Sequence, residues 1–330
     1  MELIKHLLGM IRADDVSGLL PAIDRAVTSV APLLKQARGY PDRYRKPVAT
    51  ALEYAHSLAS SIPGPIAVDS KTYASDAFVH AIFPSADFIS DAFRSSRALL
   101  EYCQKFPGSN EIYALMGMRR MEKSMMGMEL AGQVIQRDVP QNVVYFTCHT
   151  IEDPASSEQQ AREQVAWDFF DKLVYKVAKR VEARKLEKQE LLREKDILAA
   201  RLHVAAPEAR PALETKLYRI LDSVQAISSS LDLNNYVEDF ESVLLHPEQH
   251  LQLKQSTISL DSMGVRKSGE GAAQAEPVVF NDLIGFDYRN WTVTMIHCRD
   301  VPHETFAARL EAAQRRLSIF TETGKHAGIA

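Results

Sequence analysis

Two segments of the chain place a cysteine beside a histidine after a run of β-branched, aromatic and sulfur-bearing residues. They are VVYFTCHTIEDP at 143–154 and WTVTMIHCRDVP at 291–302, and in each an acid and a proline follow. Thiolate and imidazole are ligands that zinc prefers, and a thiol beside an imidazole can also act as a nucleophile. No cofactor is predicted, although the ligand types would suit zinc. The residues that would have to converge in such a site are Cys148, His149, His297, Cys298 and His303.

The alternation of side chains along a strand limits how many of these residues can share one site. Successive residues face opposite sides, so at most one member of each Cys-His pair enters a given site unless a β-bulge re-aims the chain. In the first segment Val144, Phe146 and Cys148 lie on the more apolar face. Cys148 is therefore expected inside, and His149 is expected on the opposite, wetter face.

The second segment predicts the reverse arrangement. The large apolar side chains at 291, 293 and 295 share a face with His297, so an apolar core would draw His297 inward and leave Cys298 outside. Free cysteine is among the most buried residue types, which makes Cys148 a packing residue on this interpretation. The similarity of the two segments would then be accidental.

Familiar nucleotide and hydrolase motifs are absent: the sequence has no G-x-x-x-x-G-K-[ST], G-x-S-x-G or H-E-x-x-H. One segment, TISLDSMGV at 257–265, resembles the D-x-S-x-x-G strand of PilZ-type cyclic-di-GMP-binding barrels, with Thr257 replacing the Asp and Ser262 the Gly. The resemblance covers nine residues, and the family's R-x-x-x-R pair is matched only by Arg180 and Arg184, inside an expected long helix. It implies a nucleotide-second-messenger-binding barrel with degenerate motifs as one alternative function.

Composition and charge are those of an ordinary folded protein. The 330 residues are 46% hydrophobic and 25% charged, and a chain of this length is expected to form two or three packed units. The net charge of -4 disfavours nucleic-acid binding, so no nucleic-acid partner is expected. Three cysteines are too few for a disulfide framework, and no run approaches the roughly 20 apolar residues that span a bilayer. A cytoplasmic location without a membrane span is expected.

Hydrophobic periodicity predicts an α+β, mainly helical chain. Residues 1–125 are expected to form an all-helical domain, because apolar residues recur every three or four positions between Pro and Gly breaks. β-branched and aromatic runs at 126–156, on both sides of a turn near Asp138, predict the first two strands of a β domain. The remaining strands and a closing C-terminal helix are expected at 246–320, followed by a flexible tail at 321–330. The β domain should be a five-stranded antiparallel sheet or small barrel.

Segment 157–245 is expected to interrupt the β domain with a long antiparallel coiled-coil helical hairpin. No proline or glycine occurs from Ser157 to His203, and helix formers dominate there. Pro207 and Pro211 mark the tip of the hairpin. Beyond the tip, apolar residues at alternating spacings of four and three predict an a/d seam. These residues are Leu213, Leu217, Ile220, Val224, Ile227 and Leu231.

The function that these patterns favour is a non-enzymatic interaction or scaffold protein. An exposed two-helix seam with charged flanks offers area for a protein partner or for self-association through the hairpin. The alternative from a different class is a metal- or thiol-dependent enzyme, or a metal-binding module, centred on the β domain. Methionines also gather at 116–128, where both core packing and an adaptable partner groove would suit their flexible side chains.

Overall fold

The computed structural model describes residues 16–109, 111–131, 134–261, 263–267, 275–285, 290–299 and 301. Its contacts divide the chain into two units. The first consists of Met1–Ile62, Arg162–Ser256 and Asn281–Thr292, and the second of Pro63–Ala161, Thr257–Phe280 and Val293–Ala330. The division into five segments at 125, 156, 245 and 320 stays a prediction. The expected C-terminal helix and tail lie outside the described residues.

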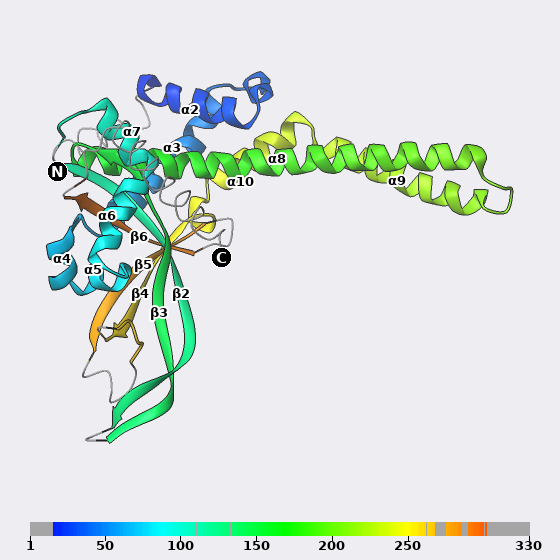
Figure 1. Cartoon of the computed structure of the whole chain (residues 1–330). Coiled ribbons are helices and arrows are strands. Elements are labelled where there is room, and N and C mark those ends of the chain that lie inside the picture. Colours follow the sequence, from blue (N-terminus) through cyan, green and yellow to red (C-terminus); the bar gives the residue numbers. More distant parts are fainter. Residues whose placement is uncertain are drawn as a thin grey trace, which may run out of the picture. The chain divides into compact units, whose positions relative to one another are not determined.

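Helices make up most of the first unit (Figure 1). They are α2 (Val16–Val30), the 3-10 helix η1 (Pro32–Gln36), α3 (Asp42–Ser61), α8 (Glu158–Val204, from Arg162 on), α9 (Arg210–Ser230), α10 (Leu233–Leu244) and the 3-10 helix η2 (Pro247–Gln249). The expected apolar face of α2 is buried at Ile23 and Val27. Tyr44 of α3 packs edge to face on Phe240 of α10 at 5.0 Å, and its hydroxyl donates to the Leu34 carbonyl at 3.0 Å. The prediction of helices is confirmed for residues 16–61.

Four short helices of the second unit each begin at a side-chain cap. They are α4 (Ser70–Ser75), α5 (Ala77–Ile82), α6 (Ala86–Ser95) and α7 (Arg97–Lys105). The capping residues accept hydrogen bonds from backbone N–H groups of the first turn, and they are Asp69, Asp76, Ser85 and Ser96. Because a cap of this type contributes about 1 kcal/mol, it compensates for the shortness of helices that have only six to ten residues.

Within the described residues the sheet has six strands, one more than expected, and its path is open. The strands are β1 (Ile66–Val68), β2 (Ile112–Ala131), β3 (Val134–Ala155), β4 (Gln252–Leu260), β5 (Glu276–Ile284) and β6 (Asn290–Cys298). Their order is β3-β2-β6-β5-β4, and β1 pairs with β6 in parallel, whereas β2 with β3 and β5 with β6 are antiparallel. Of the two expected forms, a sheet or a small barrel, the structure has the sheet, and the barrel is wrong. The expected number of strands was one too low because β1 has only three residues, which is too few to show the alternation of apolar and polar residues.

The prediction of helix up to residue 125 is wrong, because β2 occupies residues 112–131. From Ile112 to Met118 every side chain except that of Tyr113 is buried, whereas from Arg119 to Met128 almost every residue is exposed. A strand that is covered on both faces and then open on both faces shows no alternation of period two. The helical spacing of the methionines was therefore the misleading signal. Those before Arg119 pack in the core, and those after it do not.

β3 is interrupted by three β-bulges, where its register against β2 shifts by one residue. At each shift a residue of β3 adopts a positive φ, and these residues are Asp138 (58°), Cys148 (54°) and Asp153 (55°). Such values are uncommon for residues other than glycine, but a bulge leaves one residue outside the ladder and allows them. The turn predicted near Asp138 is wrong, because the polar residues there form a bulge within a continuing strand.

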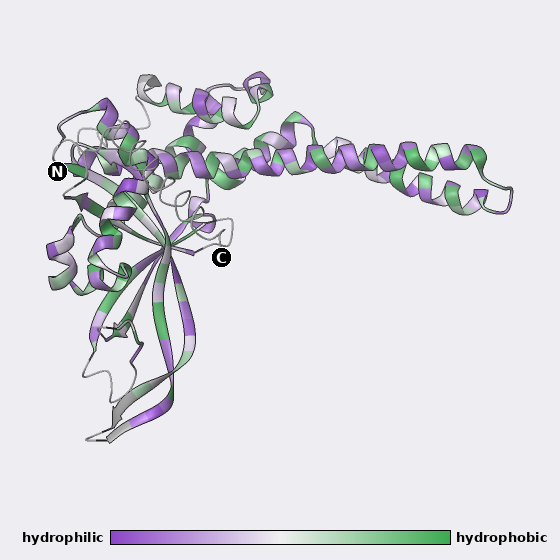
Figure 2. Cartoon of the chain, viewed as in Figure 1, coloured by the Kyte–Doolittle hydropathy of each residue, from purple (hydrophilic) through white to green (hydrophobic). Residues whose placement is uncertain are grey.

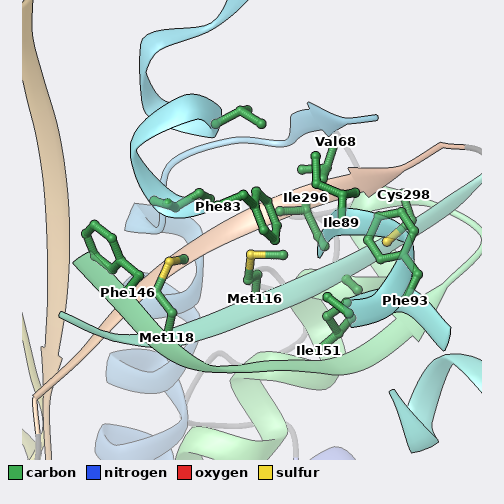
Figure 3. Close-up of a cluster of buried hydrophobic side chains, with 14 of the residues drawn as sticks. Val68, Phe83, Ile89, Phe93, Met116, Met118, Phe146, Ile151, Ile296 and Cys298 are labelled. Carbon is green, nitrogen blue, oxygen red and sulfur yellow. The ribbon is translucent and has the colours of Figure 1, made fainter. Parts of the chain in front are cut away.

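In the core of the second unit, side chains of the short helices pack against side chains of the sheet (Figure 3). Phe83 and Phe93 come from the helical segment, and Met116, Phe146 and Ile296 come from three strands. All five side chains are at most 7% exposed. Residues from distant parts of the sequence therefore meet in one apolar cluster, which fixes how the two Cys-His segments are oriented.

The two long helices expected for the hairpin are confirmed. α8 has 47 residues and α9 has 21, and residues 205–209 connect them. The expected seam residues of α9 are among its less exposed ones, but no residue of α9 is buried. The coiled-coil pairing of the two helices therefore stays a prediction.

Candidate functional site

The bulge at Cys148 places the first Cys-His pair opposite to expectation. Cys148 is exposed, and the next residue, His149, turns toward the core. The His149 Nε2 atom lies 2.7 Å from the carbonyl oxygen of Ile82, and its ring stacks on that of Phe83 with centroids 5.1 Å apart. The prediction of Cys148 inside and His149 outside is wrong, because one inserted residue reverses the alternation.

The surroundings of His149 favour a neutral imidazole. A carbonyl oxygen only accepts hydrogen bonds, so Nε2 carries a proton, and in the neutral ring Nδ1 keeps its lone pair. Burial is the main cause that lowers the pKa of His149 below its ordinary value of 6.5, and the bond to Ile82 opposes it. The Nδ1 atom is buried and has no hydrogen-bond partner among the described residues. This nitrogen is therefore not exposed to solvent.

In the second pair, Cys298 is the buried member. β6 is buried on both faces from Thr292 to Ile296, so the alternation of apolar residues gives no direction there. Cys298 is 1% exposed within the cluster of Figure 3, and burial raises the pKa of its thiol. The expected position of Cys298 outside the core is therefore wrong.

His297 is partly buried beside an acid and an aromatic ring. Its ring stacks on that of Tyr113 with centroids 4.6 Å apart and planes 11° apart. Its Nε2 atom lies 2.5 Å from Oε2 of Glu111, whose side chain is 64% exposed. The Tyr113 hydroxyl also lies 3.4 Å from Oε2 of Glu111. These contacts bring the end of β6 close to the start of β2, although Nε2 of His297 makes no hydrogen bond of normal geometry with the described residues.

The candidate ligands thus occupy separate environments. Cys148 is exposed, His149 contacts Phe83, His297 contacts Glu111, and Cys298 is enclosed by the core. Within the described part of the chain, no group of three or more His, Cys, Asp or Glu side chains is arranged to hold a metal ion. His303 lies outside the described residues. The zinc site stays a prediction.

Asp239 is a structural residue of the hairpin that sequence reasoning missed. It is 8% exposed, and its Oδ1 atom accepts from Nη2 of Arg184 at 3.1 Å and lies 3.8 Å from Nη1 of Arg180. Arg184 also donates to the carbonyl of Ser230 at 3.4 Å. A buried carboxylate requires such partners. The two arginines lie four residues apart on one helix face, so both reach the same carboxylate, but their spacing alone did not identify Asp239 as the partner.

Beyond this anchor, hydrophobic and hydrophilic residues alternate along α8 and α9 (Figure 2). We define the distal hairpin as Glu182–Val204 of α8 together with α9. Leu198 is its only buried residue. Large apolar side chains remain exposed, namely Leu186 (55%), Ile197 (47%), Val204 (86%), Tyr218 (69%) and Leu221 (42%). One open face of α8 is formed by Gln189, Leu192, Arg193, Asp196, Ile197 and Ala200. Exposed apolar residues rimmed by charge are typical of interaction surfaces.

Comparison with known proteins identifies no relative of this chain. No family model, no curated protein and no solved structure matches it. No helix within the described ranges is long and apolar enough to cross a bilayer. A functional proposal therefore has to rest on the geometry of the chain's own residues.

Proposed function

We propose that this is a non-enzymatic interaction protein that self-associates through the distal hairpin. The observation that carries the proposal is the exposure of this surface, where Leu186 and Ile197 are about half exposed and α9 has no buried residue. Surface helices of a globular protein normally bury an apolar stripe against their own core. On the distal hairpin, apolar side chains stay exposed instead, and a second copy of the chain would cover them.

The energetics of the two helices support this assignment. The 23 residues from Glu182 to Val204 extend roughly 35 Å at 1.5 Å per residue. Most helical stability in proteins comes from packing of an apolar face, which the distal hairpin has only in part. Leu186 and Ile197 are eleven residues apart, about three turns, and so lie on the same face of α8. Covering this face in a dimer would remove apolar surface from water at about 25 cal/mol per Å².

The charges of the distal hairpin permit contact between identical surfaces. Glu182–Val204 contains five acidic and six basic residues, not counting His203, and α9 contains two acidic and three basic residues. Because both signs alternate and nearly balance, two copies would not repel each other. An antiparallel arrangement of copies would bring acids and bases opposite one another, as flanking charges do in helical assemblies.

Light scattering after size-exclusion chromatography tests the proposal on the full chain at micromolar concentration. The test variant combines Leu186→Glu with Ile197→Glu, which introduces two charges on the exposed stripe. The matched control combines Thr28→Glu with Gln104→Glu, two exposed helix positions, in α2 and α7, that lie outside the distal hairpin. We expect the natural chain and the control to have the mass of a dimer or larger, and the test variant to have the mass of one chain.

Two results would contradict the proposal. A natural chain that keeps the mass of one copy at every micromolar concentration would exclude self-association. A test variant that retains the assembled mass, with an unchanged thermal melt, would place the contact on another surface. The thermal melt is measured for all three proteins so that loss of assembly is not confused with loss of folding.

A further inference from the structure

A cavity of about 770 Å³ lies within the second unit, at the β3 edge. One wall is formed by α4 and α5, a second by residues 143–146 of β3, and a third by the turn after β4 with the first part of β5. Its size lies within the range of about 300 to 1,000 Å³ that is usual for small-molecule sites. The hairpin proposed as the interaction surface lies in the other unit, so this cavity is a separate feature.

The floor of the cavity is apolar. Six lining residues belong to the buried cluster of the second unit and are at most 7% exposed, namely Ile82, Phe83, Val144, Phe146, Leu260 and Val278. Tyr73 and His80 lie on one wall with their rings 4.8 Å apart, and the half-exposed Tyr145 lies on another. An apolar or aromatic group of a ligand would therefore contact both the core side chains and aromatic rings.

The polar lining is acidic. Asp76, Asp261 and Glu276 line the cavity, and no lysine or arginine of the described residues does. Asp76 accepts from the backbone N–H groups of Phe78 and Val79 at 2.9 and 3.0 Å. These bonds orient the carboxylate without supplying a counter-charge of a full unit. Glu276, at the start of β5, is exposed.

Asp261 is oriented in the same way. Its Oδ1 atom accepts from the N–H groups of Met263 and Val265, each at 2.9 Å. Lys267 is the nearby base, with Nζ 3.9 Å from Oδ2 of Asp261, but it is not a lining residue. The acids that line the cavity therefore outnumber this base by three to one.

We infer that this cavity binds a small organic cation, an ammonium group attached to an apolar or aromatic body. The apolar part would lie on the floor, and the ammonium would lie among the acids and over the tyrosine rings, where cation–π attraction adds to the charge attraction. Phosphate-bearing ligands are commonly bound by arginine or lysine side chains or by backbone N–H groups. Among the described residues no arginine or lysine lines the cavity, and the N–H groups of Phe78 and Val79 are bonded to Asp76. The segment at 257–265 that resembles a cyclic-dinucleotide strand nevertheless contributes to the lining.

Three probes of matched shape test the charge preference by isothermal titration calorimetry with the full chain. They are 4-phenylbutylammonium, 4-phenylbutanol and 4-phenylbutanoate. We expect the ammonium to bind about tenfold more tightly than the alcohol, and the carboxylate to bind least, since tenfold corresponds to the energy of a few charge contacts at a partly exposed site. Equal affinity for the ammonium and the carboxylate, or no heat from the ammonium at millimolar concentration, would overturn the inference.

Two variants and one control test whether the ammonium probe binds in this cavity. Glu276→Gln should weaken ammonium binding by about twofold to fivefold and leave alcohol binding unchanged, whereas Asp91→Asn, an equal charge change at an exposed position of α6 outside the cavity, should alter neither. Ala74→Trp, at an exposed lining position, should abolish binding of every probe by filling the space. Unchanged binding in a folded Ala74→Trp variant would refute the location. If that variant does not fold, the contrast between Glu276→Gln and Asp91→Asn decides, and equal effects refute the inference.

Discussion

The segments 143–149 of β3 and 291–298 of β6 carry similar residues, yet they place their cysteines in opposite surroundings. Cys148 is exposed, whereas Cys298 is 1% exposed. The difference lies in the backbone and its neighbours, since β3 is an edge strand with a bulge at Cys148 and β6 is a central strand covered on both faces. A short motif supplies the same chemical groups in both places, but the strand's position in the sheet decides which group reaches solvent.

The largest expected difference between the two segments is in thiol reactivity. Cys148 should react with N-ethylmaleimide at the rate of an exposed thiol, whereas Cys298 can react only after the core opens. Its labelling should be slower by roughly a thousandfold or more, since core groups open with a large part of the unfolding free energy. A time course of native labelling, followed by peptide mass spectrometry, measures both rates. Cys103, partly buried and with its pKa raised by burial, should lie between them. Similar rates for Cys148 and Cys298 would contradict the opposite placement.

The next largest difference is in the cost of replacing sulfur by oxygen. Cys298→Ser places a hydroxyl in an apolar cluster and should lower the free energy of unfolding by about 1 to 3 kcal/mol. Cys148→Ser changes an exposed side chain and should have an effect within about 0.5 kcal/mol. Urea denaturation of both variants measures the difference, and equal losses would show that the two thiols share one environment.

Sequence patterns predicted the elements that depend on local signals. The absence of proline and glycine from Ser157 to His203 predicts α8, and the apolar spacing at Ile23 and Val27 predicts the buried face of α2. Strand propensity likewise locates β4, β5 and β6. These features arise from residues that are close in sequence, so a single chain without relatives is sufficient to find them.

Features that depend on distant partners were not predictable. β2 shows no alternation because its first half is covered on both faces by other parts of the fold. The bulge at Cys148 arises from the pairing of β3 with β2, and the residue types at that position do not predict it. The pairing of Arg184 with Asp239 joins residues 55 apart in sequence. The cavity is formed by four separate segments, so its lining could not be listed before the fold was known.

A smaller contrast between the two segments is in their response to acid, through His149. Burial lowers the pKa of His149, so the unfolded chain takes up a proton more readily than the folded chain does. The stabilising contribution is therefore present above the ordinary pKa of 6.5 and is lost as the pH falls below it. Urea midpoints of the natural chain should fall between about pH 7 and pH 5, and the fall should be shallower in His149→Gln.

His250 in the first unit gives an effect of the same sign, because burial and the neighbouring Lys176 lower its pKa. The residual pH dependence of His149→Gln should therefore decrease further in a variant that also carries His250→Gln. His203→Gln, an exposed position of α8, serves as the control. A pH profile of His149→Gln identical to that of the natural chain would show that its ring is not desolvated.

The smallest expected effect tests the bulge itself. Cys148 adopts a φ of 54°, which a residue with a Cβ atom occupies at a cost and glycine does not. Cys148→Gly should therefore stabilise the fold by up to about 1 kcal/mol, since little packing is lost at an exposed position. Cys148→Ala keeps the Cβ atom and should change the stability little. At Cys298, in a regular strand, the same change to glycine should be destabilising, because it leaves a cavity in the core. Urea denaturation of the three variants measures these differences. If glycine and alanine at 148 give the same stability, residue 148 does not adopt a positive φ. The bulge would then not explain why Cys148 is exposed and Cys298 is buried.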